Sequence, residues 1–149
     1  MTAPKVLISD KMDPKAAEIF RERGIDVDVI TGKTKEELIA MIGDYDGLAI
    51  RSSTKVTADV LAAATNLKVV GRAGIGVDNV DIPEASKKGV IVMNTPFGNS
   101  ITTAEHAIAM MFALARQIPE ADLSTQAGKW EKNKFMGVEL TSKTLGLIG

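Results

Sequence analysis

The chain has 149 residues, of which 45% are hydrophobic and 25% are charged, and its formal net charge is −1. This composition is ordinary for a globular domain with a core and excludes disordered, collagen-like and coiled-coil classes. The balanced charge gives no field that would attract nucleic acid or an anionic membrane. Because the chain has no cysteine, disulfides and thiolate sites are excluded, and we expect a reducing compartment, the cytoplasm. The first residues lack a signal-peptide pattern, and no segment is long enough to span a membrane.

Five short runs rich in β-branched and aliphatic residues predict strands in the first two thirds of the chain. They lie at residues 5–9, 26–30, 47–50, 68–72 and 90–94. The helical patterns between them begin at typical start residues, namely Asp13 with Pro14, Thr34, Thr57 and Pro83. This alternation predicts an α/β domain with a flavodoxin-like five-stranded parallel sheet and helices on both faces.

The pattern changes near "NTPFGNS", where we expect a domain boundary at Gly98. An apolar helix is predicted to start behind it, with Thr102 and Glu105 at the spacing of a capping box. A polar helix over 120–127, a basic loop over 128–137 and a final strand over 144–148 are predicted to follow. Residues 1–98 therefore form one domain, and residues 99–149 resemble part of a second unit.

Ligands of open parallel sheets bind beyond the carboxyl ends of the strands. The third predicted strand is followed by Arg51 and Ser52, and the fourth ends in Arg72. If these strands are neighbours, about 5 Å apart, the two arginines form a cationic corner suited to carboxylate or phosphate, which guanidinium groups bind through paired hydrogen bonds. Alternatively, each is a solvated strand-end arginine with an acidic neighbour, and the residues alone leave both interpretations open.

The segment "GRAGIGVDN" is predicted to form a turn after the fourth strand. Gly74 and Gly76 leave backbone N–H groups accessible to a ligand, and Asp78 and Asn79 can fix the turn through their side chains. Glycine turns are also common where nothing binds. His106, the single histidine, lies inside the predicted apolar helix, and we interpret it as structural. We find no pattern for a metal site, a nucleophile elbow or a Walker loop.

Five segments, "VVGRAGIGVDNVDI", "VMNTPFGNS", "LARQIPEA", "GKWEKNKFMG" and "KTLGLIG", resemble those of the D-isomer-specific 2-hydroxyacid dehydrogenase family, in the same order and over essentially the whole chain. The resemblance implies a substrate domain, here residues 1–98, split around an NAD-binding Rossmann domain that begins at residues 99–149 with a linker helix, a dimer arm and the first strand. It implies NAD as cofactor, homo-oligomers formed through residues 99–149, and oxidation of 3-phosphoglycerate to 3-phosphohydroxypyruvate in serine biosynthesis.

The resemblance also implies which residues form the site. Those matching substrate-binding positions are Arg51, Ser52, Arg72, Ala73, Gly74, Ile75, Gly76, Asn99 and Lys132. Ile75 and Gly149, the first glycine of the dinucleotide fingerprint, match cofactor-binding positions. The sequence departs from some relatives at Lys132, where they have arginine, and at Ile75, where they have threonine.

Because the match ends at the first fingerprint glycine, we expect these 149 residues to carry substrate recognition without a complete NAD site and without catalytic residues. Two alternatives stay open. One is a family member that reduces hydroxypyruvate or glyoxylate and needs no phosphate site. The other is a binding or dimerisation fragment without catalysis.

Overall fold

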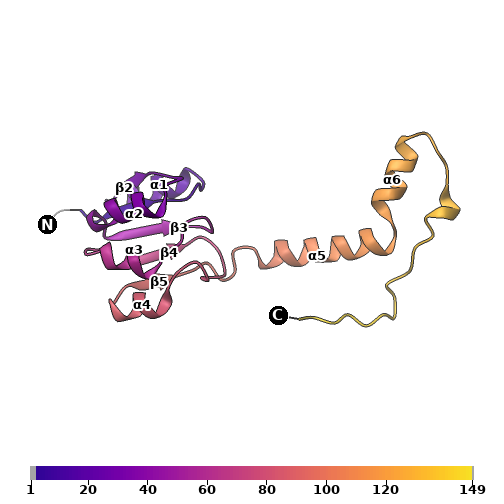
Figure 1. The fold of residues 1–149 in the computed structure, drawn as a ribbon. Coiled ribbons are helices and arrows are strands. Elements are labelled where there is room, and N and C mark those ends of the chain that lie inside the picture. The colour runs from indigo at the N-terminus through magenta and orange to yellow at the C-terminus, as the bar shows by residue number, and fades with distance from the viewer. Residues whose placement is uncertain (1–2, 149) are drawn as a thin grey trace. The chain divides into compact units, whose positions relative to one another are not determined.

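The structure is a computed structural model that describes residues 3–148 and divides the chain into two compact units, Met1–Asn99 and Ser100–Gly149 (Figure 1). The division falls one residue beyond the boundary predicted at Gly98. No helix within the described residues is long and apolar enough to cross a membrane.

The first unit is built on one parallel sheet. Its strands are β1 (Lys5–Ile8), β2 (Asp26–Val29), β3 (Gly47–Ile50), β4 (Val69–Arg72) and β5 (Ile91–Met93). They lie in the order β2-β1-β3-β4-β5, with every neighbouring pair parallel. This is the flavodoxin-like order, so the predicted fold class is confirmed. The predicted strand ends agree with the structure to within one residue.

Four helices connect these strands. They are α1 (Lys15–Glu22), α2 (Lys35–Met41), α3 (Ala58–Ala63) and α4 (Ile82–Lys87), with a 3-10 helix, η1 (Ile42–Asp44), after α2. Thr34 caps α2 as predicted, since its hydroxyl accepts from the N–H of Glu37 and the Glu37 carboxylate accepts from the N–H of Thr34. Asp81, rather than Pro83, caps α4, because its carboxylate accepts from the N–H of Glu84 while proline fits inside the first turn.

The core lies between one face of the sheet and the helices α2, α3 and α4. Side chains alternate between the two faces of a strand, so Leu7, Leu48 and Val70 all point into this core and are fully buried. The opposite face carries α1, which packs against β2. Toward β5 this second face is open, and Ile91 and Met93 are 63% and 57% exposed. The predicted helices on both faces are found, but they cover the two faces unequally.

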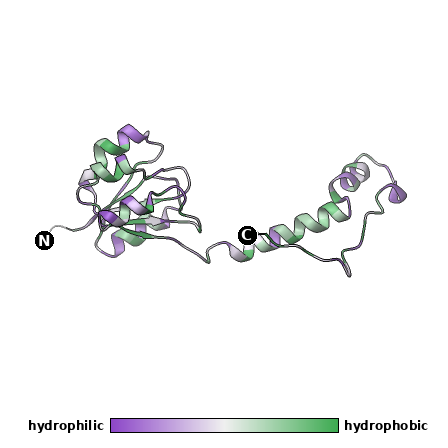
Figure 2. Cartoon of the chain, turned by 60° about the horizontal axis from the view of Figure 1, so that its bottom comes forward, coloured by the Kyte–Doolittle hydropathy of each residue, from purple (hydrophilic) through white to green (hydrophobic). Residues whose placement is uncertain are grey.

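The second unit contains α5 (Ser100–Ala115), α6 (Ile118–Gln126) and a 3-10 turn, η2 (Lys132–Lys134). Because α5 begins directly after the first unit, at Ser100, Thr102 lies inside the helix, and the predicted capping box of Thr102 with Glu105 is wrong. Apolar residues run along α5 (Figure 2), and none of its residues is buried.

The strand predicted over residues 144–148 is not formed in this chain, since the described residues of the second unit contain no strand. An apolar run becomes a strand only when a neighbour satisfies its backbone N–H and C=O groups. The chain instead turns back at Gly137, whose φ is +59°, and the N–H of Val138 donates to the Ala115 carbonyl at 2.8 Å. A Cβ on residue 137 would lie 2.3 Å from that carbonyl oxygen, so the turn requires glycine. Gly149 lies outside the described residues.

Candidate functional site

The candidate site lies at the carboxyl edge of the sheet in the first unit. The strand order reverses between β1 and β3, and the crevice beyond such a switch point is where open α/β sheets bind ligands. Asp10 follows β1 at this point, and the loop Arg51–Thr54 follows β3. The turn after β4 lies beside that loop, because Ile50 pairs with Arg72 in the sheet.

The loop Arg51–Thr54 is fixed from one side by Asp10, whose exposed fraction is 5%. The Asp10 carboxylate accepts from the N–H of Arg51 at 2.6 Å, and from the N–H and the hydroxyl of Thr54 at 3.1 and 2.8 Å. The hydroxyls of Ser9 and Thr54 lie 2.9 Å apart. Within residues 3–148, the N–H groups of Ser52 and Ser53 make no hydrogen bond, and both residues are exposed.

Asn79 fixes the same loop from the other side. Its amide donates to the carbonyls of Arg51 and Thr54 at 2.8 and 2.7 Å. The expectation that Asn79 fixes its own turn is therefore wrong. The physical reason is that the carbonyls of Arg51 and Thr54, although distant from Asn79 in the sequence, lie beside it in the loop after β3 and need a hydrogen-bond donor.

The two predicted arginines come together in the sheet, but their guanidinium groups have different partners. Arg51 donates to the carbonyl of Lys11 at 3.2 Å, whereas Arg72 donates to the carbonyls of Arg51, at 3.3 Å, and Gly76. The Arg72 side chain is 13% exposed and lies 3.6 Å from Asp78, whose side chain is 88% exposed. An ion pair with so exposed a partner is weak, and it leaves Arg72 able to bind another anion.

The turn after β4 is held through its carbonyl groups. Asn94 donates to the carbonyl of Ile75 at 2.7 Å, and the N–H of Thr95 donates to that of Gly74 at 2.9 Å. The N–H groups of Ile75 and Gly76 have no acceptor among the described residues. A Cβ on Gly76 would lie 3.0 Å from both the Arg72 guanidinium and the Asp78 carboxylate, so glycine keeps these groups close together. A fixed turn with accessible N–H groups suits an anion.

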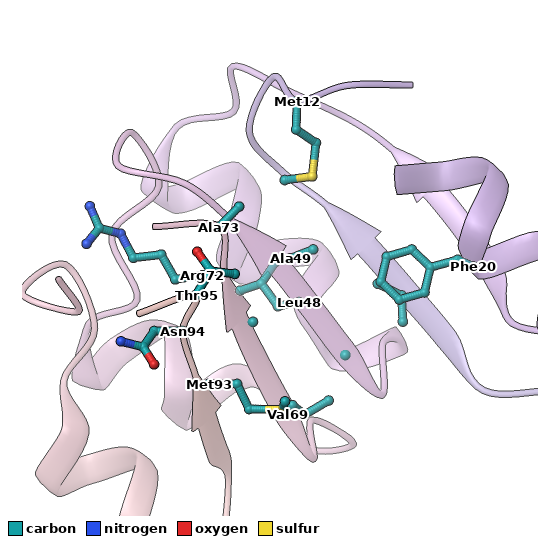
Figure 3. Close-up of a pocket in the computed structure, with 13 residues that line it drawn as sticks. Met12, Phe20, Leu48, Ala49, Val69, Arg72, Ala73, Met93, Asn94 and Thr95 are labelled. Atoms are coloured by element: carbon teal, nitrogen blue, oxygen red, sulfur yellow. The ribbon is translucent and has the colours of Figure 1, made fainter. Parts of the chain in front are cut away.

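A hollow of about 430 Å³ adjoins this edge (Figure 3). Its apolar part is the open face of the sheet, with Met12, Phe20 and Met93 around it, and Arg72 and Asn94 lie at its polar end. The Arg72 guanidinium points away from the apolar side chains in Figure 3. The hollow is thus mainly an uncovered sheet surface, and the polar chemistry lies at its rim.

The amino ends of the strands carry a different set of charges. The Lys5 ammonium is hydrogen-bonded to Asp28 at 2.9 Å, which lowers the pKa of that carboxyl and raises the pKa of the lysine. Asp46 accepts from the Lys68 ammonium at 2.8 Å and from the N–H of Lys5 at 3.0 Å, and both contacts lower its pKa. These carboxylates brace the sheet at the edge opposite the candidate site.

The remaining predicted residues belong to the end of the first unit or to the second unit, or lie outside the described residues. Asn99 is the exposed last residue of the first unit, and Lys132 is exposed in η2 of the second unit. His106 is exposed on α5. Residues 3–148 contain no group of three or more His, Cys, Asp or Glu side chains that could hold a metal ion.

Comparison with known proteins gives a consistent result. Residues 6–144 match the family described as "D-isomer specific 2-hydroxyacid dehydrogenase, catalytic domain". The D-3-phosphoglycerate dehydrogenases of Homo sapiens and Archaeoglobus fulgidus are 56% and 52% identical to the chain over 145 residues. These matches cover 97% of this chain but only 27% and 28% of the relatives, so the chain spans about a quarter of their length.

Solved structures agree with this result. The NAD+-bound 3-phosphoglycerate dehydrogenase of Entamoeba histolytica superposes with a TM-score of 0.68 and 33% identity, covering 76% of this chain and 40% of the other. The TT0316 protein of Thermus thermophilus gives a TM-score of 0.81 and 30% identity, covering 91% and 45%. The chain belongs to the D-isomer specific 2-hydroxyacid dehydrogenase family.

Proposed function

We propose that this chain is the substrate-recognition part of an NAD-dependent dehydrogenase that oxidises 3-phosphoglycerate to 3-phosphohydroxypyruvate, the reaction that begins serine biosynthesis. The observation that carries the proposal is the identity of 52% and 56%, over almost the whole chain, with relatives named D-3-phosphoglycerate dehydrogenase. The candidate site supports it, since one sheet edge carries two arginines and two sets of exposed N–H groups that suit the two anionic groups of this substrate.

Within this proposal, each part of the edge has a role. Arg51 and Ser52 bind the phosphate with the loop after β3, and Arg72 supplies a second cation. The turn Ala73–Gly76 holds the carboxylate through the N–H groups of its last two residues. Residues 1–98 are the substrate domain, and residues 99–149 begin the NAD-binding domain. By their match to the family, Asn99 and Lys132 are further substrate-binding residues, and the catalytic residues lie elsewhere in the protein.

NAD, when bound, accepts a hydride from the hydroxyl-bearing carbon of the substrate. Of the residues proposed to contact it, Ile75 presents an apolar, 44% exposed side chain on a turn held by Asn94, which suits contact with a flat ring. The described residues 144–148 form no strand from which a glycine turn could receive the pyrophosphate. Among the described residues, the fit to NAD is therefore limited to Ile75.

We also propose that the protein forms homo-oligomers through residues 99–149 and works in the cytoplasm. Within the chain, Ile101 and Leu114 at the two ends of α5 are 74% and 82% exposed. Apolar surface of this kind is characteristic of a protein interface. The absence of cysteine suits a reducing compartment.

A thermal-shift titration tests the substrate. At ten times its dissociation constant, a ligand stabilises the folded chain by about 1.4 kcal/mol, which raises Tm by roughly 3–11 °C. We expect this response to 3-phosphoglycerate and a smaller one to D-glycerate, which lacks the phosphate. Equal responses would favour the hydroxypyruvate or glyoxylate reductases instead. No response to either compound would favour a fragment without a substrate site.

A further inference from the structure

Two side chains hold the loop after β3. One binds the backbone N–H groups at the two ends of the loop, and the other binds the carbonyls at the same two ends. Arg51 and Thr54 each donate their N–H to the carboxylate of Asp10 and each accept, at their carbonyl, from the amide of Asn79. Between these fixed ends, Ser52 and Ser53 are exposed and their N–H groups have no acceptor within residues 3–148. One acid and one amide thus hold a four-residue loop whose centre is open.

We propose that Asp10 and Asn79 are positioning residues that shape this loop to receive an anionic group of the substrate, an inference that rests on the proposed function. Asp10 is too buried to contact the substrate itself and carries the wrong charge for it. Its carboxylate acts by occupying the outer N–H groups of the loop. The inner N–H groups and the Arg51 guanidinium are then left for a phosphate or carboxylate.

A carboxylate suits residue 10 because the groups that face it are hydrogen-bond donors. A buried carboxylate must be matched by donors or cations, and among the described residues Asp10 forms no ion pair, so the loop and Thr54 supply its donors. Asn79 has the complementary chemistry, because its NH₂ group carries two donors and can serve both carbonyls of the loop at once. An amide NH₂ at residue 10 would face the N–H donors of the loop, and a carboxylate at residue 79 would face its carbonyl acceptors.

Pre-organisation explains why this arrangement matters for binding. A four-residue loop that is free in solution must be ordered when it binds an anion, and that entropy opposes binding. With both ends fixed, most of the ordering is complete before the ligand arrives. Asn79 also follows the turn Ala73–Gly76 closely in sequence, so the two anion-binding segments are connected through one side chain.

The alternative is that Asp10 only stabilises the fold, and Asp46 provides the matched control. Asp46 also accepts a backbone N–H, that of Lys5 at 3.0 Å, but at the opposite edge of the sheet. Asp10→Asn and Asp46→Asn are both isosteric and both remove a carboxylate that braces the sheet. A structural role predicts that the two variants lose stability and keep binding. A positioning role predicts a binding loss for Asp10→Asn alone.

The experiment is an NMR titration of the ¹⁵N-labelled 149-residue chain with 3-phosphoglycerate, with melting measured alongside. We expect Asp10→Asn and Asn79→Asp each to bind about tenfold more weakly, as for the loss of one charge-assisted contact, and Asp46→Asn to bind within about twofold of the unmodified chain. Binding by Asp10→Asn equal to that of Asp46→Asn contradicts the inference alone. If the unmodified chain shows no binding, the proposed function fails, and the inference falls with it.

A second pair of variants decides the matter if Asp10→Asn does not fold. Thr54→Val keeps the volume of the side chain but removes the hydroxyl that donates to Asp10 at 2.8 Å, whereas Thr54→Ser keeps it. We expect a several-fold weaker affinity for 3-phosphoglycerate in the valine variant and a normal affinity in the serine variant. Equal affinities for the two variants would overturn the role of the Asp10 contact.

Discussion

The two units of the chain deal with their apolar residues in opposite ways. In Met1–Asn99, alternate residues of the central strands are fully buried under three helices. In Ser100–Gly149, no described residue is buried, although α5 is among the most apolar segments of the chain. The comparison teaches that helix formation and core formation are separate requirements. The first unit satisfies both within this chain, whereas the second has helices without a core of its own.

The largest expected difference between the units comes from removing apolar side chains. Leu7→Ala in the first unit leaves a cavity in a packed core and is expected to lower the free energy of unfolding by about 2–5 kcal/mol. Leu114→Ala in the second unit removes a side chain that is exposed in the single chain, and at a concentration where the chain is monomeric it is expected to change the free energy of unfolding by less than about 0.5 kcal/mol. Urea unfolding followed by circular dichroism measures both variants. Comparable losses would mean that Leu114 is buried in solution.

Self-association is the next test, because an uncovered apolar helix needs a partner. We expect sedimentation velocity to show the 149-residue chain as an oligomer, and the variant Ile101→Glu/Leu114→Glu as a monomer. The control is Ile91→Glu, which places the same charge on the open sheet face of the first unit. A monodisperse monomer for the unmodified chain at high concentration would contradict the proposed interface.

Substitutions at the helix starts are expected to change stability by a smaller amount, and again to different extents in the two units. Thr34 caps α2 through two reciprocal hydrogen bonds, so Thr34→Ala is expected to cost about 0.5–2 kcal/mol of stability. Thr102 lies inside α5, where alanine is the better helix former, so Thr102→Ala is expected to cost nothing. Thermal unfolding of both variants measures the difference. Equal losses would show that α5 begins at Thr102 in solution.

The smallest effect is on acid stability. The folded-state pKa of Asp28 is lowered chiefly by its hydrogen bond from Lys5 and then by that from Tyr45, so this carboxylate stabilises the fold above its unfolded pKa. That contribution is lost as the pH falls from about 4 through the lowered folded pKa. We expect Asp28→Asn to be less stable than the unmodified chain above about pH 5 and to converge with it as the pH falls to about 2, which flattens the acid limb of stability. An unchanged acid limb would show that the pair is fully screened.

Much of the first unit could be predicted because its signals are local. β-branched runs identify strands, and Thr34 with Glu37 identifies a helix start from neighbours three residues apart. The hydrogen bonds that hold the loop Arg51–Thr54 could not be predicted. They join Asp10 to residues about forty positions away and Asn79 to residues about twenty-five positions away. Only the sheet order brings these groups together.

The predicted strand over 144–148 does not form in this chain for a related reason. Its apolar run satisfies the sequence pattern of a buried strand, but a strand forms by pairing, and no pattern within the run supplies the partner. The same limit applies to the two arginines. Their neighbouring strands could be expected from the fold class, but the separate carbonyl partners of their guanidinium groups depend on loops whose shape is set by distant side chains.

The most direct test of the central claim, that the first unit carries a formed anion site at the carboxyl edge of its sheet, is to map which backbone amides respond to 3-phosphoglycerate by ¹H–¹⁵N NMR. We predict saturable shifts at Ser52 and Ser53 and at Ile75 and Gly76, with α5 unchanged. Shifts confined to residues 118–135, or none within Met1–Asn99 at millimolar ligand, would contradict the account.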